Sequence, residues 1–361
     1  MNQRVRRRCW ARPIGRKLAV MTFLSGVRSR VRTAGLALIA LATLLASCGR
    51  PAAMGEADSL IVVADEALWS EVEQETYDAI ETTLFTIRDE KKFYITHVAP
   101  ASNELDQLLL WKQVVVFGIP GDPLIDQVAE AAGRETLNPP EIFQTPNVWA
   151  GGQAVTAVVL EPGREAASWR ASLSELHELL DRQYRLWALN RMWISGEDTT
   201  LTRQLEQQLG FTLRVPAVYG YQFRDDDLVV IRNDNPDPSD LIRSLLVQRR
   251  PRTDSLDAAT ILDWRAGIDS VEYAVPQSFE AAPGPGQPIE VDGVRGLEVR
   301  GAWRDEGDYP AGGPFFARAL TCPDATFFID AWLYSPNPRR SKWQYIMQME
   351  EILGSFACRG N

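Results

Sequence analysis

The chain has 361 residues, of which 45% are hydrophobic and 24% are charged. This composition is typical of a globular protein and argues against a disordered chain, a collagen-like repeat or a polytopic membrane protein. The charge is unevenly distributed, because residues 1–47 contain ten of the 38 Lys and Arg residues and none of the 48 Asp and Glu residues. The part after Ser47 therefore has a net charge of −20, which makes nucleic acid a poor partner.

The N-terminal segment has the form of a secretory leader. Basic residues precede an apolar run at residues 35–47, which is shorter than the roughly 20 apolar residues that a membrane-spanning helix needs. The motif Leu45-Ala46-Ser47-Cys48 resembles the lipobox of bacterial lipoproteins, in which the cysteine thiol receives the lipid and the chain is cut just before it. We therefore predict a lipoprotein signal peptide at residues 1–47 and lipidation, palmitate included, at Cys48.

The lipidated cysteine predicts where in the cell the protein is located. Its lipid would anchor the chain to a membrane of the cell envelope, and Gly49 rather than Asp follows it, which by resemblance to enterobacterial sorting favours the outer membrane facing the periplasm. Residues 1–20 are long and basic for such a leader, and Met21 would begin one of ordinary proportions, so the start is either Met1 or Met21. Residues 48–58 are small and polar and predict a flexible tether.

The remaining cysteines suggest a covalent link. Cys9 lies in the leader and Cys48 is the anchor, which leaves Cys322 and Cys358 in the exported part. A cysteine pair outside the cytoplasm favours a disulfide. The alternative is that both are buried free thiols.

Residues 59–195 alternate apolar runs with helical patterns, which predicts an α/β-like N-terminal half. A capping box at Ser70-x-x-Glu73 predicts where the first helix begins. Two glycines, Gly151 and Gly152, predict a hairpin turn. The expected strands are 60–64, 92–98, 113–119, 147–149 and 153–160, and the expected helices are 70–84, 103–111, 122–132 and 163–194.

Residues 196–361 have short strand patterns and predict an antiparallel sheet with a closing C-terminal helix, so the whole chain is expected to be α+β. The expected strands are 211–215, 218–224, 228–232, 241–248, 296–303, 315–321 and 326–334, and the expected helices are 201–209, 258–271 and 341–356. Ser341-x-x-Gln344 predicts the cap of the closing helix. The halves are expected either to divide near Gly196 or to form one continuous domain.

Sequence motifs for catalysis are scarce. The two histidines, His97 and His177, have no G-x-S-x-G motif near them and lack metal-ligand spacing, so we predict structural roles for both and no metal or cofactor. Two dense carboxylate clusters lie at Asp225–Asp227 and Asn233–Asp240. A calcium loop is a poor match to the second cluster, which has Pro236 and Pro238, and turn chemistry explains both clusters.

Three C-terminal segments carry a family resemblance: residues 300–315, residues 329–336 and the pair Met349-Glu350. Together with residues 60–69, they resemble the domain-of-unknown-function family 4837 (DUF4837), so we expect the resemblance to span nearly all of the exported chain. Ala311 departs from the family pattern, which has Met there. The resemblance implies a lipoprotein of diderm bacteria, and it implies no catalytic residues, because the family has no assigned activity.

Within this stretch, Gly312-Gly313-Pro314 predicts a tight turn in which one glycine has a positive φ. The alternative is a binding loop in which a ligand approaches the backbone amides. The residues of that predicted binding loop are Arg300, Trp303, Arg304, Asp305, Gly312, Gly313, Pro314 and Phe315.

Two functions are consistent with these features. The first is a non-enzymatic, membrane-anchored envelope lipoprotein that binds an envelope protein or glycan through the face with the Gly-Gly-Pro-Phe segment. The alternative is a cell-envelope hydrolase that uses paired carboxylates, which would need two carboxyl groups roughly 5–10 Å apart in one pocket.

Overall fold

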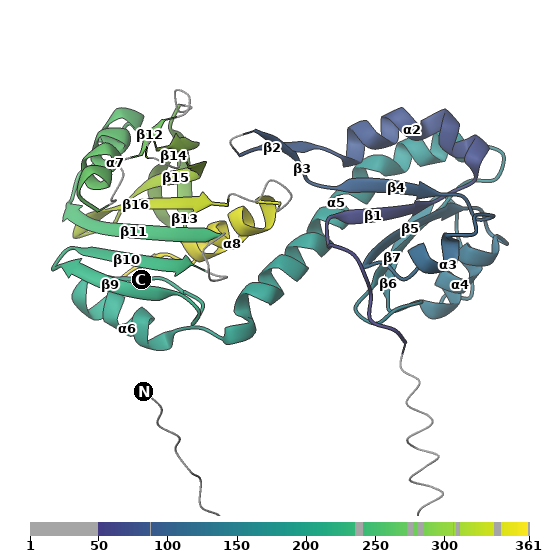
Figure 1. Cartoon of the computed structure of the whole chain (residues 1–361), viewed down its shortest axis with the longest axis horizontal. Coiled ribbons are helices and arrows are strands. Elements are labelled where there is room, and N and C mark those ends of the chain that lie inside the picture. The colour runs from purple at the N-terminus through teal and green to yellow at the C-terminus, as the bar shows by residue number, and fades with distance from the viewer. Residues whose placement is uncertain are drawn as a thin grey trace, which may run out of the picture. The chain divides into compact units, whose positions relative to one another are not determined.

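The structure, a computed structural model, describes residues 50–359 except 87, 235–240, 273–276, 280–284, 306, 308–310 and 336–340. The predicted signal peptide, Cys48 and Gly49 lie outside the described residues, as does most of the cluster Asn233–Asp240. The described part is mixed α+β, as predicted: a mostly parallel sheet with helices is followed by an antiparallel sheet and a C-terminal helix (Figure 1).

The N-terminal sheet has the strand order β4-β1-β5-β7-β6. The first four strands pair in parallel and β6 pairs antiparallel with β7. Every residue of β5 and β7 is buried, because helices cover both faces of the sheet. The strands are β1 (Ser59–Val63), β4 (Tyr94–Val98), β5 (Gln113–Gly118), β6 (Glu141–Pro146) and β7 (Ala154–Val159).

Two helices pack on each face of this sheet (Figure 1). One pair is α2 (Glu66–Ile80) and α5 (Glu165–Met192), and the other is α3 (Leu105–Leu108) and α4 (Pro123–Ala131). Trp169 of α5 is completely buried, and its indole Nε1–H donates to the Thr76 hydroxyl of α2 at 2.9 Å. The helix expected at 163–194 is therefore present as α5 and packs against α2 in the core.

The β6–β7 hairpin begins earlier than predicted. Its first strand ends at Pro146, where we expected a strand at 147–149. Asn147 has a φ of 58°, and a residue in this left-handed region cannot continue a strand. The turn residue Gly152 also has a positive φ, so the predicted position of the turn itself is correct.

Both predicted capping boxes are wrong. Asp65 caps α2, and its Oδ1 accepts from the backbone N–H groups of Ala67 and Leu68, whereas the hydroxyl of Ser70 donates to the Glu66 carbonyl inside the helix. The cap position of the closing helix is Lys342, and Ser341 precedes it without a capping bond. Where a strand ends decides which polar residue reaches the first free N–H groups, and the local motif alone does not contain that information.

An unpredicted hairpin follows α2. The sequence suggested that the helix continues to residue 84, but it ends at Ile80, and the strands β2 (Thr83–Phe85) and β3 (Asp89–Lys91) follow. Glu90 of β3 is buried.

The C-terminal sheet is antiparallel and, in the described residues, has the strand order β12-β14-β15-β16-β11-β10-β9, with β13 also paired to β14. The other predicted strands are present in this sheet, but the strand expected at 211–215 is only two residues long and lies outside it. Strands β12 and β13 were not predicted. The strands are β9 (Gly220–Asp225), β10 (Leu228–Asp234), β11 (Ile242–Pro251), β12 (Ser278–Phe279), β13 (Gln287–Val291), β14 (Val294–Arg304), β15 (Gly312–Thr321) and β16 (Ala325–Tyr334).

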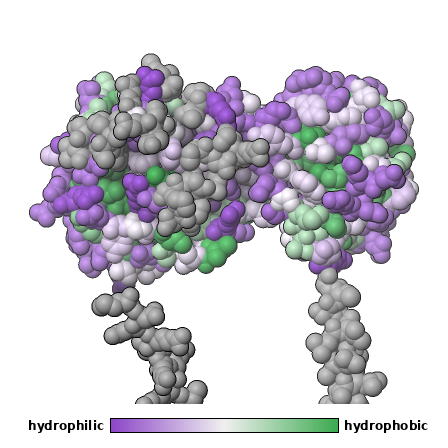
Figure 2. All heavy atoms as spheres, in the orientation of Figure 1, coloured by the Kyte–Doolittle hydropathy of each residue, from purple (hydrophilic) through white to green (hydrophobic). Residues whose placement is uncertain are grey.

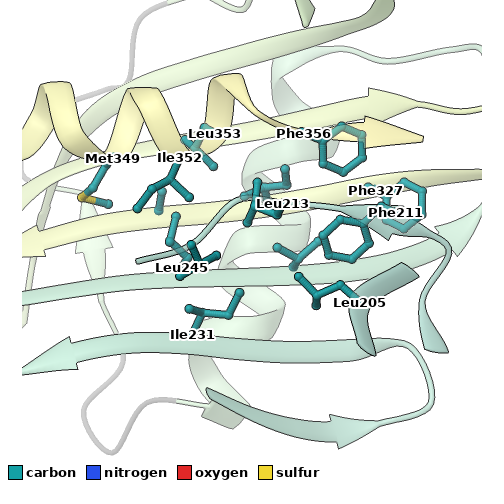
Figure 3. Packing of buried hydrophobic residues seen from close by; sticks show 14 of the residues in the cluster. Leu205, Phe211, Leu213, Ile231, Leu245, Phe327, Met349, Ile352, Leu353 and Phe356 are labelled. Carbon is teal, nitrogen blue, oxygen red and sulfur yellow. The ribbon is translucent and has the colours of Figure 1, made fainter. Parts of the chain in front are cut away.

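Helices cover both faces of this sheet as well. One face packs on α6 (Thr199–Gln208) and α8 (Trp343–Gly354), and the other packs on α7 (Ala258–Glu272). Figure 3 shows the first core, in which side chains of α8 meet those of the sheet and of the segment after α6. A short 3₁₀ helix, η1 (Trp193–Ser195), follows α5, and the two-residue strands β8 (Phe211–Thr212) and β17 (Ala357–Cys358) pair with each other.

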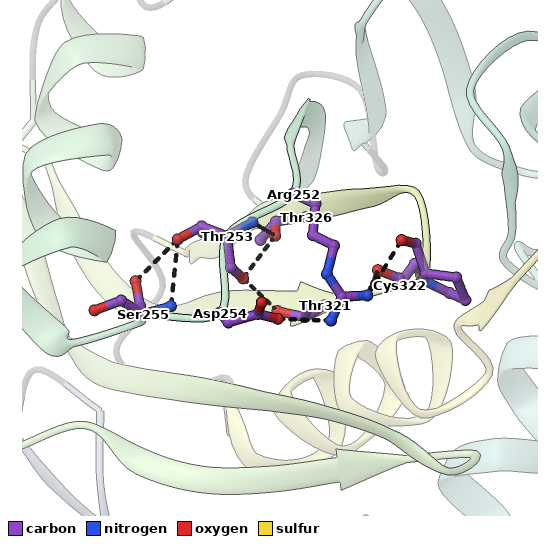
Figure 4. Close-up of polar contacts among 8 residues, drawn as sticks. Arg252, Thr253, Asp254, Ser255, Thr321, Cys322 and Thr326 are labelled. Carbon is purple, nitrogen blue, oxygen red and sulfur yellow. Dashed lines mark hydrogen bonds and ion pairs between the residues drawn. The ribbon is translucent and has the colours of Figure 1, made fainter.

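The predicted disulfide between Cys322 and Cys358 is confirmed, with Cα atoms 5.8 Å apart. Cys322 lies in the β15–β16 turn, and Cys358 lies in β17 just beyond α8. The Arg252 guanidinium braces the same turn by donating to the carbonyls of Cys322 and Pro323 at 3.2 and 3.1 Å (Figure 4). The C-terminus is thus tied to the end of the antiparallel sheet.

Candidate binding site

Two polar residues occupy inward-facing positions on β10 and β11. Ile231 and Leu245 are paired across these strands and are buried in the core beneath α8. Side chains two residues apart on a strand share a face, so Asn233 and Arg243, which are also paired, continue this inward face. The core face therefore ends in an amide and a guanidinium.

Arg243 is buried without a carboxylate partner. The residue is 9% exposed, and its guanidinium carbon lies 5.5 Å from the Tyr219 ring centre and 5.4 Å from the Tyr345 ring centre. Its Nη1 donates weakly to Oε1 of Gln348 at 3.5 Å, and its Nε has no hydrogen-bond partner. Buried arginines are normally paired with acids, yet none forms an ion pair with Arg243 among the described residues.

The neighbours of Arg243 are also unsatisfied. Asn233 is 2% exposed, and neither its Nδ2 nor its Oδ1 has a partner in the described part of the chain. The same holds for the hydroxyl of Tyr219, whose pKa is raised by burial. A buried polar atom without a hydrogen bond costs about 1–3 kcal/mol, so folded proteins keep few of them. We call Tyr219, Asn233, Arg243, Tyr345 and Gln348 the Arg243 cluster.

The Arg243 cluster lines a cleft of about 1190 Å³. The opposite wall comes from the N-terminal half and contributes Asp58, Lys112 and Tyr184. Two exposed apolar side chains lie on the lining, Ile194 at 82% and Val218 at 51% exposure. A concave site with a few buried polar groups and apolar lining is typical of a ligand-binding site.

Acidic groups lie on the far wall of the cleft. Burial raises the pKa of Asp58, and the negative charge of Glu56, which also lines the cleft, adds to the rise, whereas a backbone hydrogen bond and Lys112 oppose it. Figure 2 shows that hydrophilic residues cover most of the face in view, and that apolar residues form separate groups on it. The cleft is therefore lined by the guanidinium of Arg243 and by the carboxyl groups of Glu56 and Asp58, with the Lys112 ammonium near Asp58.

The family model called Domain of unknown function (DUF4837) matches residues 198–355. The chain contains a DUF4837 domain. The match begins at Asp198, so it is narrower than the resemblance that we expected, and residues 60–69 lie outside it. All five residues of the Arg243 cluster belong to the DUF4837 domain.

Other comparisons are weak. The chain matches none of the curated protein sequences. The solution structure of cyanobacterial PsbP (CyanoP) from Synechocystis sp. PCC 6803 aligns with 41% of this chain and 86% of its own, at 13% identity and a TM-score of 0.29. A crystal structure from Bacteroides thetaiotaomicron VPI-5482 aligns with 43% of this chain and 50% of its own, at 9% identity and a TM-score of 0.24. Neither similarity supports an inference about this chain.

The predicted turn at Gly312-Gly313-Pro314 is wrong. These residues begin strand β15 of the DUF4837 domain, where Gly313 pairs with Trp303 and Gly312 pairs with Arg304. Neither glycine has a positive φ. The glycines are needed for a different reason: a Cβ on Gly313 would overlap the carbonyl oxygen of Leu333, and one on Gly312 would lie 2.9 Å from the carbonyl oxygen of Trp303.

The true connection between β14 and β15 starts at Asp305. Its Oδ1 accepts from the backbone N–H groups of Gly307 and Ala311, and its own N–H donates to the Ala311 carbonyl. Arg304, the last residue of β14, is exposed. Asp305 therefore has the turn role that we expected of the glycines.

The predicted binding-loop residues do not form one loop. Trp303 and Phe315 are 2% and 0% exposed in the core beneath α7, and the Trp303 indole donates to the Leu333 carbonyl at 3.3 Å. Pro314 is buried as well. Side chains alternate between the two faces along a strand, so Arg300 lies on the face opposite that of Trp303. There it is paired with Phe316 of β15.

Arg300 belongs to an ion-pair network. It donates to Oε1 of Glu298 at 2.5 Å and to Oε1 of Glu350 at 2.6 Å, and it lies 4.6 Å from the Phe316 ring. Arg318 donates to the second carboxylate oxygen of Glu298 at 2.5 Å. Arg300 and Glu350, two of the residues that carry the family resemblance, thus link strand β14 to helix α8.

The histidines lie in aromatic surroundings. The His97 ring stacks on Trp69 at 4.5 Å, and its Nε2 lies 3.0 Å from the Ala64 carbonyl. His177 packs edge-on against Phe93, and burial lowers its pKa. In the described part of the chain, no group of three or more His, Cys, Asp or Glu side chains is placed to hold a metal ion. None of the described helices has an apolar stretch long enough to cross a bilayer.

Sequence reasoning missed the Arg243 cluster. The signal was available in two alternating patterns, Val229-x-Ile231-x-Asn233 and Arg243-x-Leu245-x-Val247, in which a polar residue occupies a position of the apolar face. Each pattern alone resembles a strand that ends in a polar residue. Only the register of β10 against β11 shows that both polar residues are buried together.

Proposed function

We propose that this chain is a membrane-anchored lipoprotein of the bacterial cell envelope whose folded part binds a ligand in the cleft at the Arg243 cluster. The observation that carries the binding role is the set of buried polar atoms without partners among the described residues of Tyr219, Asn233 and Arg243. A ligand with complementary polar groups would offset the desolvation of these atoms.

The proposed cellular location is inferred from the predicted signal peptide. The lipobox at Leu45–Cys48 supports a lipid anchor, and Gly49 supports an outer membrane location facing the periplasm. The predicted tether at residues 48–58 is shorter than expected, because Ala52 and Met54 form β-bridges with Gly151 and Trp111. The lipid anchor is therefore proposed to hold the folded part close to that membrane, where an envelope protein or glycan is the source of the ligand. The DUF4837 domain is consistent with this role but assigns no activity.

A bulky side chain at the cleft tests the binding function. The full chain, extracted from membranes with mild detergent, should retain a small molecule in native mass spectrometry. Val218 is exposed on the cleft lining, so Val218→Trp should fold and exclude that molecule. Leu186→Trp is the matched control, because Leu186 is equally exposed on α5 but does not line the cleft. Equal retention by wild type and Val218→Trp would contradict the proposal.

One observation favours the alternative, a hydrolase that uses paired carboxylates. Glu56 and Asp58 line the same cleft, and burial raises the pKa of Asp58, as expected for a general acid. If this alternative is correct, the full chain should release soluble fragments from purified peptidoglycan sacculi, and Asp58→Asn should abolish the release. Fragment release that is insensitive to Asp58 and Glu56 substitutions would exclude this pair.

A further inference from the structure

The guanidinium of Arg243 is buried with a single weak hydrogen-bond partner among the described residues. The rings of Tyr219 and Tyr345 both lie within cation–π distance of its guanidinium carbon, at 5.5 and 5.4 Å, and restrict its movement. The Nε–H remains without an acceptor, and Gln348 provides only one contact at 3.5 Å. An Arg edge of this kind matches the spacing of two oxygens on a carboxylate or a phosphate.

We propose that the Arg243 cluster binds an anionic oxygen group, a carboxylate or a phosphate, of the ligand in the cleft; this rests on the binding function proposed above. Arg243 supplies the positive charge. Asn233 lies directly across the strand pair from it, where Cβ atoms are generally about 4.5–5.5 Å apart, and supplies an amide donor. The Tyr219 hydroxyl supplies a further donor.

The charges around the cleft support an anion at this end. A guanidinium stays protonated, so a buried arginine needs a negative partner, and no described acid forms an ion pair with Arg243. Arg191 also lines the cleft and adds positive charge. The acids Glu56 and Asp58 lie on the wall from the N-terminal half, so they would orient the ligand with its hydrogen-bond donors toward that wall.

Calorimetric titration of the full chain, dialysed free of small molecules, tests this assignment with three probes: inorganic phosphate, succinate and neutral glycerol. We expect phosphate or succinate to bind and glycerol not to bind, and the stronger of the two anions identifies the ligand group. Arg243→Met should lower the affinity for that anion at least about tenfold, since hydrogen bonds to charged groups contribute about that factor or more. Asn233→Leu should weaken it less.

Arg232→Gln is the matched control. Arg232 precedes Asn233 on β10 but faces the other side of the sheet, where it pairs with Asp234 at 2.6 Å. Its substitution should change the affinity less than twofold. Arg243→Lys keeps the charge but loses the planar fork, so it should bind more weakly than wild type and more tightly than Arg243→Met.

A purely structural Arg243 would behave differently. In ligand-free protein, Arg243→Met should leave the unfolding midpoint equal or higher, because it removes a buried charge without a partner. A large drop in the midpoint, or no binding of either anion, would overturn the assignment. A neutral molecule retained by wild type and lost in Val218→Trp would overturn it as well, and would leave the binding function intact.

Discussion

Lys342 and Glu90 form a buried ion pair between residues 252 positions apart in the chain. The ammonium of Lys342 is 2.5 Å from Oε1 of Glu90, and the Lys342 backbone N–H donates to Oε2 at 3.0 Å. Their side chains are 2% and 8% exposed. The next residue, Trp343, stacks on Tyr184 of α5 with ring centres 4.2 Å apart. The start of α8 in the DUF4837 domain therefore contacts the N-terminal half through both a charge pair and an aromatic stack.

Removing one partner of this pair should destabilise the fold strongly. Glu90→Gln leaves the Lys342 ammonium buried without a counter-charge, which costs about 3–5 kcal/mol in comparable cases. The double variant Glu90→Gln with Lys342→Met removes both charges and should recover a large part of that loss. Urea unfolding of the wild type, Glu90→Gln, Lys342→Met and the double variant measures the difference. A double variant as unstable as the sum of the two single variants would contradict the ion-pair account.

The disulfide should contribute substantially to stability. Cys322 and Cys358 are separated by 36 residues, for which the loop-closure model gives about 4 kcal/mol. Substituting both with Ser should lower the free energy of unfolding by about that amount. Thiol titration of the unfolded, unreduced Cys48→Ala protein without its leader should detect no free thiol. Two free thiols in that titration would refute the bond in solution.

Gly313→Ala should destabilise the central part of the antiparallel sheet. The added Cβ would overlap the Leu333 carbonyl oxygen of the neighbouring strand, and backbone cannot move aside cheaply, so we expect a loss of about 3 kcal/mol. Gly267→Ala is the control, because a Cβ there meets no atom within 4 Å and replaces glycine inside helix α7. It should be neutral or stabilise by up to about 1 kcal/mol. Thermal unfolding distinguishes the two, and equal effects would contradict the steric explanation.

Asp269 should make stability depend on pH. It shares the completely buried Arg265 with Asp330, and both Arg265–carboxylate distances are 2.9 Å. Burial raises the pKa of Asp269 from 3.8 to about 7; Arg265 opposes the rise and Asp330 adds to it. The folded state therefore binds the Asp269 proton more tightly than the unfolded state does. The stability that this proton contributes is fully present below about pH 4 and is lost as the pH rises through 7.

Asp269→Asn should therefore remove a decrease in stability between pH 4 and 7, measured by urea unfolding across that range. The matched control is Asp263→Asn on the exposed side of the same helix, which should keep the decrease. An unchanged pH dependence in Asp269→Asn would show that another group causes it.

The lipid anchor can be tested at one residue. Cys48→Ala removes the thiol that would carry the lipid, so labelling with a fatty-acid analogue should disappear and the protein should become soluble or remain unprocessed. Ser47→Ala keeps a small residue before the cysteine and should still be labelled. Persistent labelling of Cys48→Ala would disprove the anchor.

Much of the secondary structure follows from short-range pattern. The runs at Leu60–Val63 and Val114–Phe117 are continuous and apolar, and they form strands buried on both faces. Helix boundaries could not be predicted as well. Asp65 and Ser70 are both suitable N-cap residues, and Asp65 is the cap because β1 ends just before it. The Gly312-Gly313 prediction is wrong for a similar reason. Glycine is used both where a turn needs a positive φ and where a neighbouring strand leaves no room for a Cβ, and the sequence does not distinguish these two cases.

The sequence by itself determined the α+β class and the family resemblance, because periodicity and motif order are properties of the linear chain. It also left Cys322 and Cys358 as the candidate pair in the exported part, and the structure decided that they form a disulfide rather than two free thiols. Only the tertiary structure decided where the candidate site lies. Strand register places Asn233 opposite Arg243, the packing of α8 adds Tyr345 and Gln348, and the N-terminal half supplies the far wall of the cleft. Burial of an unpaired charge is a property of surroundings that come from distant segments, so no local pattern could reveal it.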